Sequence, residues 1–162
     1  MTIRKAEMRE LDRIMRIYDG ARAYMRENGN AEQWSGGYPS AELIASDIDN
    51  GFCHVCIENE EIVGVFCYFW GEDPTYHRIY EGAWINERPY GVLHRIAVDK
   101  HCKGVASRCF DFCLSQCHNL KIDTHHDNIP MQRSLAKNGF TRCGIIYLEN
   151  GDPRIAYQKS DA

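Results

Sequence analysis

The sequence lacks the features that direct a chain to membranes or nucleic acids. No run approaches the roughly 20 apolar residues that a membrane-spanning helix needs, and the longest, Val63 to Trp70, has the length of a strand. There is no cluster of basic residues, and 19 basic against 23 acidic residues give a formal charge of −4. A net acidic chain is poorly suited to hold the phosphates of nucleic acid or an anionic membrane surface. We therefore expect neither as a partner.

Other absences narrow the class of protein further. Residues 1–7 lack the apolar core of a signal peptide, so we expect a cytoplasmic protein. Glycine and proline, 13 and 5 residues, follow no repeat, which excludes collagen-like and low-complexity chains. What is present is 44% hydrophobic and 26% charged residues, the balance of an ordinary globular protein. A length of 162 residues predicts one domain covering residues 1–162.

The eight cysteines are expected to be free thiols, because nothing indicates secretion. Cys109, Cys113 and Cys117 are four residues apart, which places them on one face of a helix as small core residues. Cys53 and Cys56 have CxxC spacing but lie in a strand-like run, where residues three apart point to opposite faces. No second pair follows at zinc-finger spacing, so we expect no metal.

Periodicity and turn residues divide the chain into helices and strands. The predicted strands cover residues 2–5, 52–58, 61–71, 91–98, 120–124, 140–148 and 154–159, and the predicted helices cover 8–27, 41–49, 104–118 and 130–137. The aromatic-rich connection 72–89 is long enough to build or cover a site. This order predicts an α/β (α+β) fold.

Residues 93–107 have the layout of a strand, a turn and a helix start, with small residues at Gly104 and Ala106. The N-terminus of a helix offers unpaired N–H groups and a positive dipole end, and small side chains let phosphates approach the backbone. Neither a Walker loop nor a GxGxxG fingerprint is present. Taken alone, the small residues Gly104 and Ala106 fit a phosphate site and a simple tight turn equally well.

Ile96-Ala97-Val98 is followed by His101-x-x-Gly104-x-Ala106, then Asn128, then Asn138-Gly139-Phe140. This order of motifs resembles the GNAT acetyltransferase superfamily. The family's pyrophosphate motif is Gln/Arg-x-x-Gly-x-Gly/Ala, followed by a strand, an Asn and a helix that ends in Gly-Phe. The resemblance covers essentially the whole chain. It implies a mixed, mostly antiparallel central sheet with helices on both faces, and acetyl-CoA as cosubstrate.

The resemblance also implies where acetyl-CoA would bind. The backbone of Ile96, Ala97 and Val98 would hold the pantetheine arm, which Asn128 would contact. The residues assigned to the pyrophosphate are His101, Cys102, Lys103, Gly104, Val105, Ala106 and Ser107. His101 stands where Gln or Arg is usual, a tolerable change because backbone amides make most of the phosphate contacts.

The acid of the family's usual mechanism is missing. The family often has a Tyr seven residues after the Asn as a general acid, and that position is Leu135. Tyr147 is a candidate replacement. The thiolate of the coenzyme needs little protonation to leave, since a thiol pKa is about 8.5.

The resemblance implies direct attack of a neutral amine on the thioester, which a base near pKa 7 would assist. We choose His94 as the first candidate, because it precedes Ile96 by two and is expected on the same strand face. It also matches a position where aromatic-amine members of the family place a catalytic His. A half-buried structural histidine is the alternative, and His125 and His126 are second choices.

In this family the acceptor pocket is built by the first inter-helix loop, the central strand and the last hairpin. The corresponding candidates are Trp34, Tyr38, Tyr68, Trp70, Tyr147, Glu149 and Asp152. Aromatic faces and carboxylates suit a cationic amine. Core packing is the alternative for Tyr68 and Trp70, because they lie in a strand.

The predicted function is transfer of an acetyl group from acetyl-CoA to a primary amine of a small molecule. Two alternatives stay open: a protein or peptide N-acetyltransferase, and a non-catalytic acyl-CoA-binding module suggested by Leu135. Domains of this size often pair through exposed sheet edges, so a weakly held homodimer is expected.

Overall fold

The computed structural model describes residues 1–161, and its elements follow the predicted order closely. The strands are β1 (Thr2–Lys5), β2 (Cys53–Glu58), β3 (Glu61–Trp70), β4 (Gly91–Val98), β5 (Asn119–Thr124), β6 (Thr141–Tyr147) and β7 (Pro153–Ser160). The helices are α1 (Leu11–Glu27), α2 (Ala41–Asp49), α3 (Val105–Cys117) and α4 (Ile129–Lys137), with 3-10 turns η1 (Met8–Glu10) and η2 (Pro74–Tyr76). Residue 162, the last of the predicted domain, lies outside the described residues.

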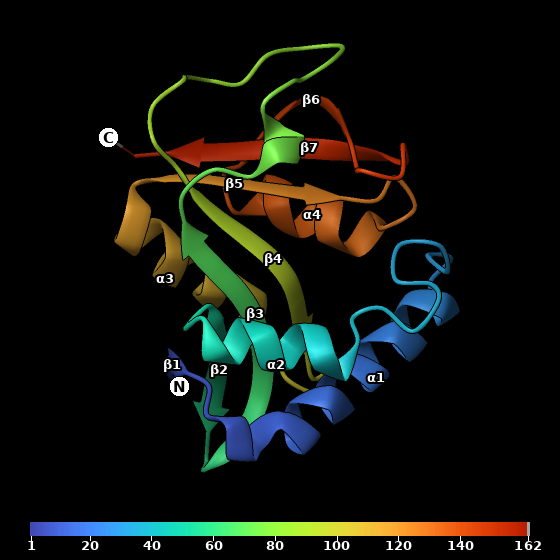
Figure 1. Ribbon diagram of the computed structural model, residues 1–162, viewed down its shortest axis with the longest axis vertical. Helices are drawn as coiled ribbons and strands as arrows, with labels where there is room; N and C mark the ends of the chain where they lie inside the picture. The colour runs from blue at the N-terminus through green and yellow to red at the C-terminus, as the bar shows by residue number, and fades with distance from the viewer. Residues whose placement is uncertain (162) are drawn as a thin grey trace.

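The described strands form a seven-stranded sheet in the order β1-β2-β3-β4-β5-β7-β6. Neighbours are antiparallel except β4 and β5, which run parallel. In the final hairpin, β7 pairs with β5, and β6 is the outer strand at the edge of the sheet. The prediction of a mixed, mostly antiparallel sheet is confirmed (Figure 1). The outer strands, β1 and β6, are the edges through which the predicted homodimer would pair.

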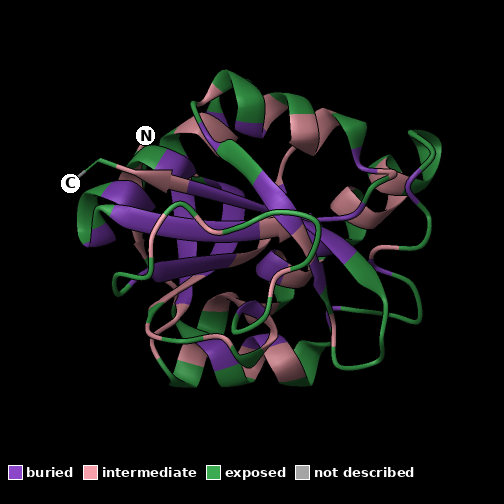
Figure 2. Ribbon diagram, turned by 90° about the horizontal axis from the view of Figure 1, so that it is seen from above, coloured by how far each residue is buried: buried purple, intermediate pink, exposed green. Residues whose placement is uncertain are grey.

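Helices cover both faces of the sheet, as expected (Figure 2). On one face, α1 and α2 bury Ile14 and Ile44 against Val65. On the other, α3 and α4 bury Phe110 and Leu135 in a second core cluster. Within residues 1–161, no helix is both long and apolar enough to cross a membrane.

The cysteines behave as small core residues. Cys109, Cys113 and Cys117 are all buried on α3, where they pack against the sheet. Cys53 and Cys56 belong to the core clusters on opposite faces of the sheet, as strand geometry requires. All eight thiols are free.

A bulge in β4 opens the sheet. Arg95 has a left-handed φ of 52°, and the register of β4 against β3 shifts between Val65 and Cys67. A bulge bends its strand and increases the local twist. Beside it, β4 and β5 are paired only at Gly91–Leu120 and Val92–Lys121, after which they diverge (Figure 1).

The same bulge corrects one expectation from the sequence. His94 and Ile96 do not share a strand face: Ile96 packs with Leu93 toward α3, whereas the His94 ring lies against Phe69 and Tyr76. Strict alternation would place residues 94 and 96 together, but the extra residue at position 95 shifts the alternation by one.

The connection between β3 and β4 covers the sheet face opposite α3 and α4. It buries Tyr76 and Tyr90 against Val92 of β4 and Ile146 of β6. Only the start of this connection, at Asp73 and Thr75, reaches the space between β4 and β5.

Candidate active site

A cleft of about 450 Å³ lies where β4 and β5 separate. Its volume is in the range of pockets for small molecules. From the α3–α4 side it is lined by Ile96, Ile122, Thr124 and Met131, and from the opposite side by Asp73, His94, Asp123 and Arg154. Trp34 and Tyr38, which were predicted for the acceptor pocket, line it from the loop between α1 and α2. The cleft is therefore reached from both faces of the sheet.

His94 is held by a carboxylate. Its Nε2 lies 2.7 Å from Oδ2 of Asp73. The other Asp73 oxygen, Oδ1, accepts from the amide and the hydroxyl of Thr75 at 2.8 and 2.7 Å. Burial raises the pKa of Asp73, but the hydrogen bonds from His94 and Thr75 outweigh it and lower the pKa to about 2. Asp73 therefore stays ionised near neutral pH and orients the imidazole.

A second carboxylate lies on the other side of the ring. Oδ2 of Asp123 is 3.9 Å from Nδ1 of His94 and accepts a 2.6 Å hydrogen bond from the Tyr76 hydroxyl. Burial and the Asp123 charge raise the pKa of Tyr76, so this hydroxyl remains a donor. With the Nε2 proton assigned to the Asp73 bond, the lone pair of the neutral ring is on Nδ1. This arrangement suits a proton acceptor.

Arg95 clamps the bulge. Its Nε and Nη2 donate to the two carboxylate oxygens of Asp47 at 3.0 and 2.9 Å, and Nη1 donates to the Tyr38 hydroxyl at 3.1 Å. The Arg95 carbonyl accepts from the Tyr18 hydroxyl at 2.7 Å. A bidentate guanidinium–carboxylate pair fixes geometry as well as charge. The bulge is thus tied to α1, α2 and the loop that carries Tyr38.

Asn128 joins that loop to α4. Its Oδ1 accepts from the Met131 amide at 3.2 Å and caps the helix, while its Nδ2 donates to Oε1 of Gln33 at 3.0 Å. Asn128 lines the cleft, where it was predicted to contact the pantetheine arm.

The start of α3 has open backbone donors. Gly104 is the N-cap with a φ of 76°, and no side chain caps the first turn or places an acid in it. The amides of His101 and Cys102 already donate to Asp99 at 2.9 and 3.0 Å. Residues 101–107 were expected to bind the pyrophosphate. Of their backbone amides, those of residues 103–107 remain available.

Thr124 has the one hydroxyl among the described residues that is buried without a hydrogen-bond partner, and it lies at the end of β5 in the cleft wall. The edge of β4 that faces β5 is likewise unpaired beyond Val92. Buried polar groups ordinarily find partners. An extended molecule with amide groups would satisfy both.

Of the residues predicted for the acceptor pocket and the general acid, four lie outside the cleft lining, which corrects their placement. Tyr68 is half-buried on the α3 face, where its ring lies over Gly91 and beside Cys117. Trp70 is 56% exposed at the end of β3.

The other two, Tyr147 and Glu149, are at the tip of the last hairpin. Tyr147 is exposed and packs edge-on against Tyr80 at 5.2 Å, so it is not placed to act as the general acid. Glu149 points into solvent in the turn. The hairpin contributes Leu148, Asn150, Asp152 and Arg154 to the cleft instead, and of these Asp152 was predicted.

Asp73, Asp123 and Arg154 escaped the sequence analysis. For Asp123 a signal existed, because alternation with the buried Leu120 and Ile122 places it on the opposite face of β5. Asp73 is 21 residues from His94 in an irregular segment, where no periodicity operates.

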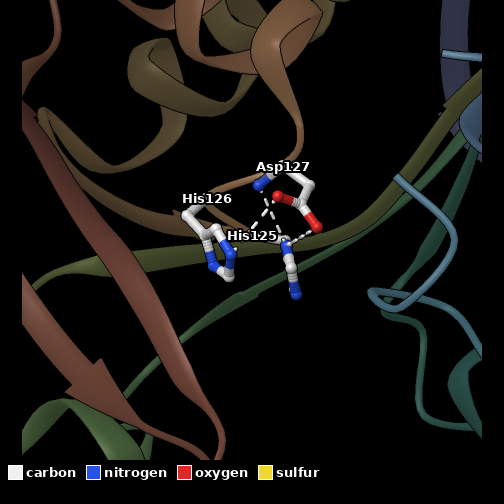
Figure 3. Close-up of side chains that lie close together, drawn as sticks. All are labelled: His125, His126 and Asp127. Carbon is white, nitrogen blue, oxygen red and sulfur yellow. Dashed lines mark hydrogen bonds and ion pairs between the residues drawn. The ribbon is translucent and has the colours of Figure 1, made fainter. Parts of the chain in front are cut away.

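Three side chains after β5 lie close enough together to hold a metal ion: His125, His126 and Asp127, with ligand atoms within 4.8 Å of one another (Figure 3). Nδ1 of His125 already accepts a 3.0 Å hydrogen bond from the Asp127 amide. The His126 ring stacks on that of His125. The cluster is thus explained by the turn that leads into α4, and none of its three residues lines the cleft.

Comparisons with known proteins identify the family of the chain. The model of the Acetyltransferase (GNAT) family matches residues 11–140. A GNAT-family acetyltransferase structure from Streptococcus agalactiae is 32% identical, with a TM-score of 0.91 over 99% of this chain and 95% of that one. A putative acetyltransferase from Staphylococcus aureus is 25% identical, with a TM-score of 0.72 over 99% of both chains.

A GNAT-family acetyltransferase from Bacillus cereus is 26% identical, with a TM-score of 0.65 over 99% of this chain and 98% of that one. Among curated proteins the search found no match. The family match covers well over half of the chain, and the Streptococcus structure exceeds 30% identity over nearly all of it. The chain belongs to the GNAT family of acetyltransferases and is an acyltransferase enzyme.

Proposed function

We propose that the protein transfers the acetyl group of acetyl-CoA to the primary amine of a small molecule, with His94 as the general base. The observation that carries this proposal is the Asp73–His94 pair, bonded at 2.7 Å within the cleft between β4 and β5. A histidine with an ionised carboxylate on one nitrogen is oriented to accept a proton on the other.

The residues present fit the cosubstrate. The unpaired β4 edge at Ile96, Ala97 and Val98 and the orphaned Thr124 hydroxyl would hold an amide-bearing arm, and the open amides at residues 103–107 would hold a pyrophosphate. Lys103 is exposed at that helix start, where its positive charge favours the same anion. When bound, acetyl-CoA supplies an activated acetyl group on a thioester.

The acceptor side of the cleft provides the remaining chemistry. Asp73 and Asp123, on either side of the ring, attract a protonated amine, and His94 Nδ1 takes a proton from it. Backbone N–H groups on the unpaired edge of β4 are available to stabilise negative charge on a carbonyl oxygen.

No side chain replaces the family's tyrosine at its usual place. Leu135 is fully buried in the core between α4 and the sheet. We propose that a general acid at this position is dispensable here.

The size of the acceptor follows from what lines the cleft. Asp73 and Thr75 of the connection between β3 and β4 line one side, and the loop bearing Trp34 and Tyr38 lines the other, held by Arg95 and by the Gln33–Asn128 hydrogen bond. These walls support a small molecule as acceptor and disfavour a long peptide.

The test is transfer of isotope-labelled acetyl from acetyl-CoA to pooled amines, amino acids, polyamines and peptides, with products identified by mass spectrometry. We expect a labelled small molecule, and His94→Ala to lower kcat at least about tenfold while acetyl-CoA binds with unchanged affinity by calorimetry. His77→Ala is the matched control, because His77 is exposed and pairs only with Glu72.

Labelled peptide without a labelled small molecule would contradict the proposed acceptor class. An unchanged pH–rate profile in His94→Ala would contradict the role of His94. Tight binding of acetyl-CoA with no transfer to any amine would favour the acyl-CoA-binding module.

A further inference from the structure

Arg154 is a buried cation without a counter-ion. Its side chain is only 6% exposed and lines the cleft. Its one hydrogen bond is from Nη1 to the carbonyl of its neighbour Pro153, at 2.8 Å. Among residues 1–161 no carboxylate forms an ion pair with it. None of its free donor atoms is fully buried, so they face the open space of the cleft, where a guanidinium can bind an anionic group of a ligand.

The other arginine of the cleft shows the contrast. Arg95 is bonded to both oxygens of Asp47 and to Tyr38, and its charge is already balanced. Arg154 keeps its Nε and Nη2 donors free of any described partner. The planar fork of a guanidinium matches the two oxygens of a carboxylate.

Strand register places Arg154 on the same side of the sheet as the candidate base. Ala156 of β7 is directly opposite Asp123 of β5, and Arg154 is two residues before Ala156. Residues two apart in a strand share a face. Arg154 therefore lies on the face of Asp123 and His94, the acceptor side of the cleft.

The charges on that face are divided between two ends. Asp73 and Asp123 surround His94, where an amine would react. Arg154 is just beyond the end of β5, close to His125. Burial and the Arg154 charge lower the pKa of His125. A molecule with an ammonium at one end and an anion at the other matches both ends.

We propose that Arg154 binds the carboxylate of the acceptor, and that the acceptor is a small amino acid-like molecule carrying an amine and a carboxylate together. This inference rests on the proposed acetylation of small amines and narrows their class. Arg154 sets specificity and takes no part in proton transfer.

The test compares three acceptors with the same side chain: an amino acid, its amide, and the amine that lacks the carboxyl group. For the wild-type protein we expect kcat/KM for the amino acid to exceed that for the other two by about 10- to 100-fold, the range of a charge-assisted hydrogen bond. Arg154→Met should reduce this preference to about one, and Arg154→Lys should retain part of it. Arg142→Met, at an exposed position on the neighbouring strand, should keep the wild-type preference.

A wild-type enzyme that acetylates the amide or the amine as well as the amino acid would overturn the proposal, as would an undiminished preference in Arg154→Met. Urea unfolding checks that each variant is folded. If Arg154→Met does not fold, the proposal is judged from the acceptor preference of the wild-type protein and from its reduction in Arg154→Lys.

If no amine is acetylated, the proposed function fails, and calorimetry still tests Arg154. Amino acids should then bind the wild-type protein saturated with CoA and bind Arg154→Met at least about tenfold more weakly, with Arg154→Lys between the two. Equal binding by these proteins, or no binding at all, would overturn the carboxylate site by itself.

Discussion

Replacing Asp73 by Asn tests the electrostatics of the candidate site, because it removes a charge while keeping the shape of the side chain. In the folded protein the pKa of Asp73 falls from 3.8 to about 2. At about 1.36 kcal/mol per pKa unit, this corresponds to about 2 kcal/mol of stability. The ionised form contributes it above pH 3.8, and it is lost as the pH falls through about 2.

Asp73→Asn should therefore lower the free energy of unfolding by about 2 kcal/mol at pH 7, with the difference from wild type shrinking between pH 4 and pH 2. It should also lower kcat/KM by about 10- to 100-fold, since His94 loses the carboxylate that orients it. Urea unfolding across this pH range and acetyl transfer at pH 7 measure the two effects.

Glu72→Gln is the control, because Glu72 is an exposed neighbouring acid whose ion pair is with His77. If Asp73→Asn and wild type unfold at the same urea concentration at pH 7 and keep the same activity, the reasoning about this carboxylate is refuted.

Three further substitutions probe other parts of the structure. Lys121→Met should stabilise the protein by about 1–2 kcal/mol at pH 7 in urea unfolding, because burial lowers the pKa of Lys121 from 10.5 to about 8 and cation–π contacts offset part of the cost. Wild-type stability should rise between pH 8 and 10.5 as the folded protein loses this proton first, and Lys121→Met should lack that rise. Gly82→Ala should lower the melting temperature and raise KM for the acceptor, because the added Cβ would clash with the Cys143 carbonyl and displace the connection between β3 and β4. Leu135→Tyr should destabilise the protein by about 1–3 kcal/mol without raising kcat, since position 135 is in the core; a gain in kcat would contradict its placement.

The helices and strands were predictable because their residues follow simple periods. The cysteines of α3 recur every four residues, and Ser40 caps α2 by accepting from the Leu43 amide. The gap between β4 and β5 was not predicted, because nothing in the local pattern of β4 reveals the bulge at Arg95.

The candidate site was predictable only in part, for the same reason. Trp34 and Tyr38 are in the cleft because they lie on a loop that borders it, whereas His94 faces it because the bulge at Arg95 shifts the alternation that the sequence analysis assumed. Asp73 and Arg154 reach it through contacts between distant segments, and such pairings leave no periodic signal in a single sequence. The prediction for Tyr147 was wrong because this residue lies on an edge strand. There, a one-residue difference in alternation determines whether a side chain faces the cleft or the solvent.

The Arg95 clamp has a consequence for how related chains can diverge. Asp47 of α2 is 48 residues from Arg95, yet its carboxylate holds the guanidinium that fixes the bulge. Loss of either partner alone would leave a buried charge unpaired, whereas replacement of both together could preserve the strand geometry. Positions 47 and 95 should therefore covary among homologues: both residues should be kept, or both substituted, even though α2 lies outside the cleft.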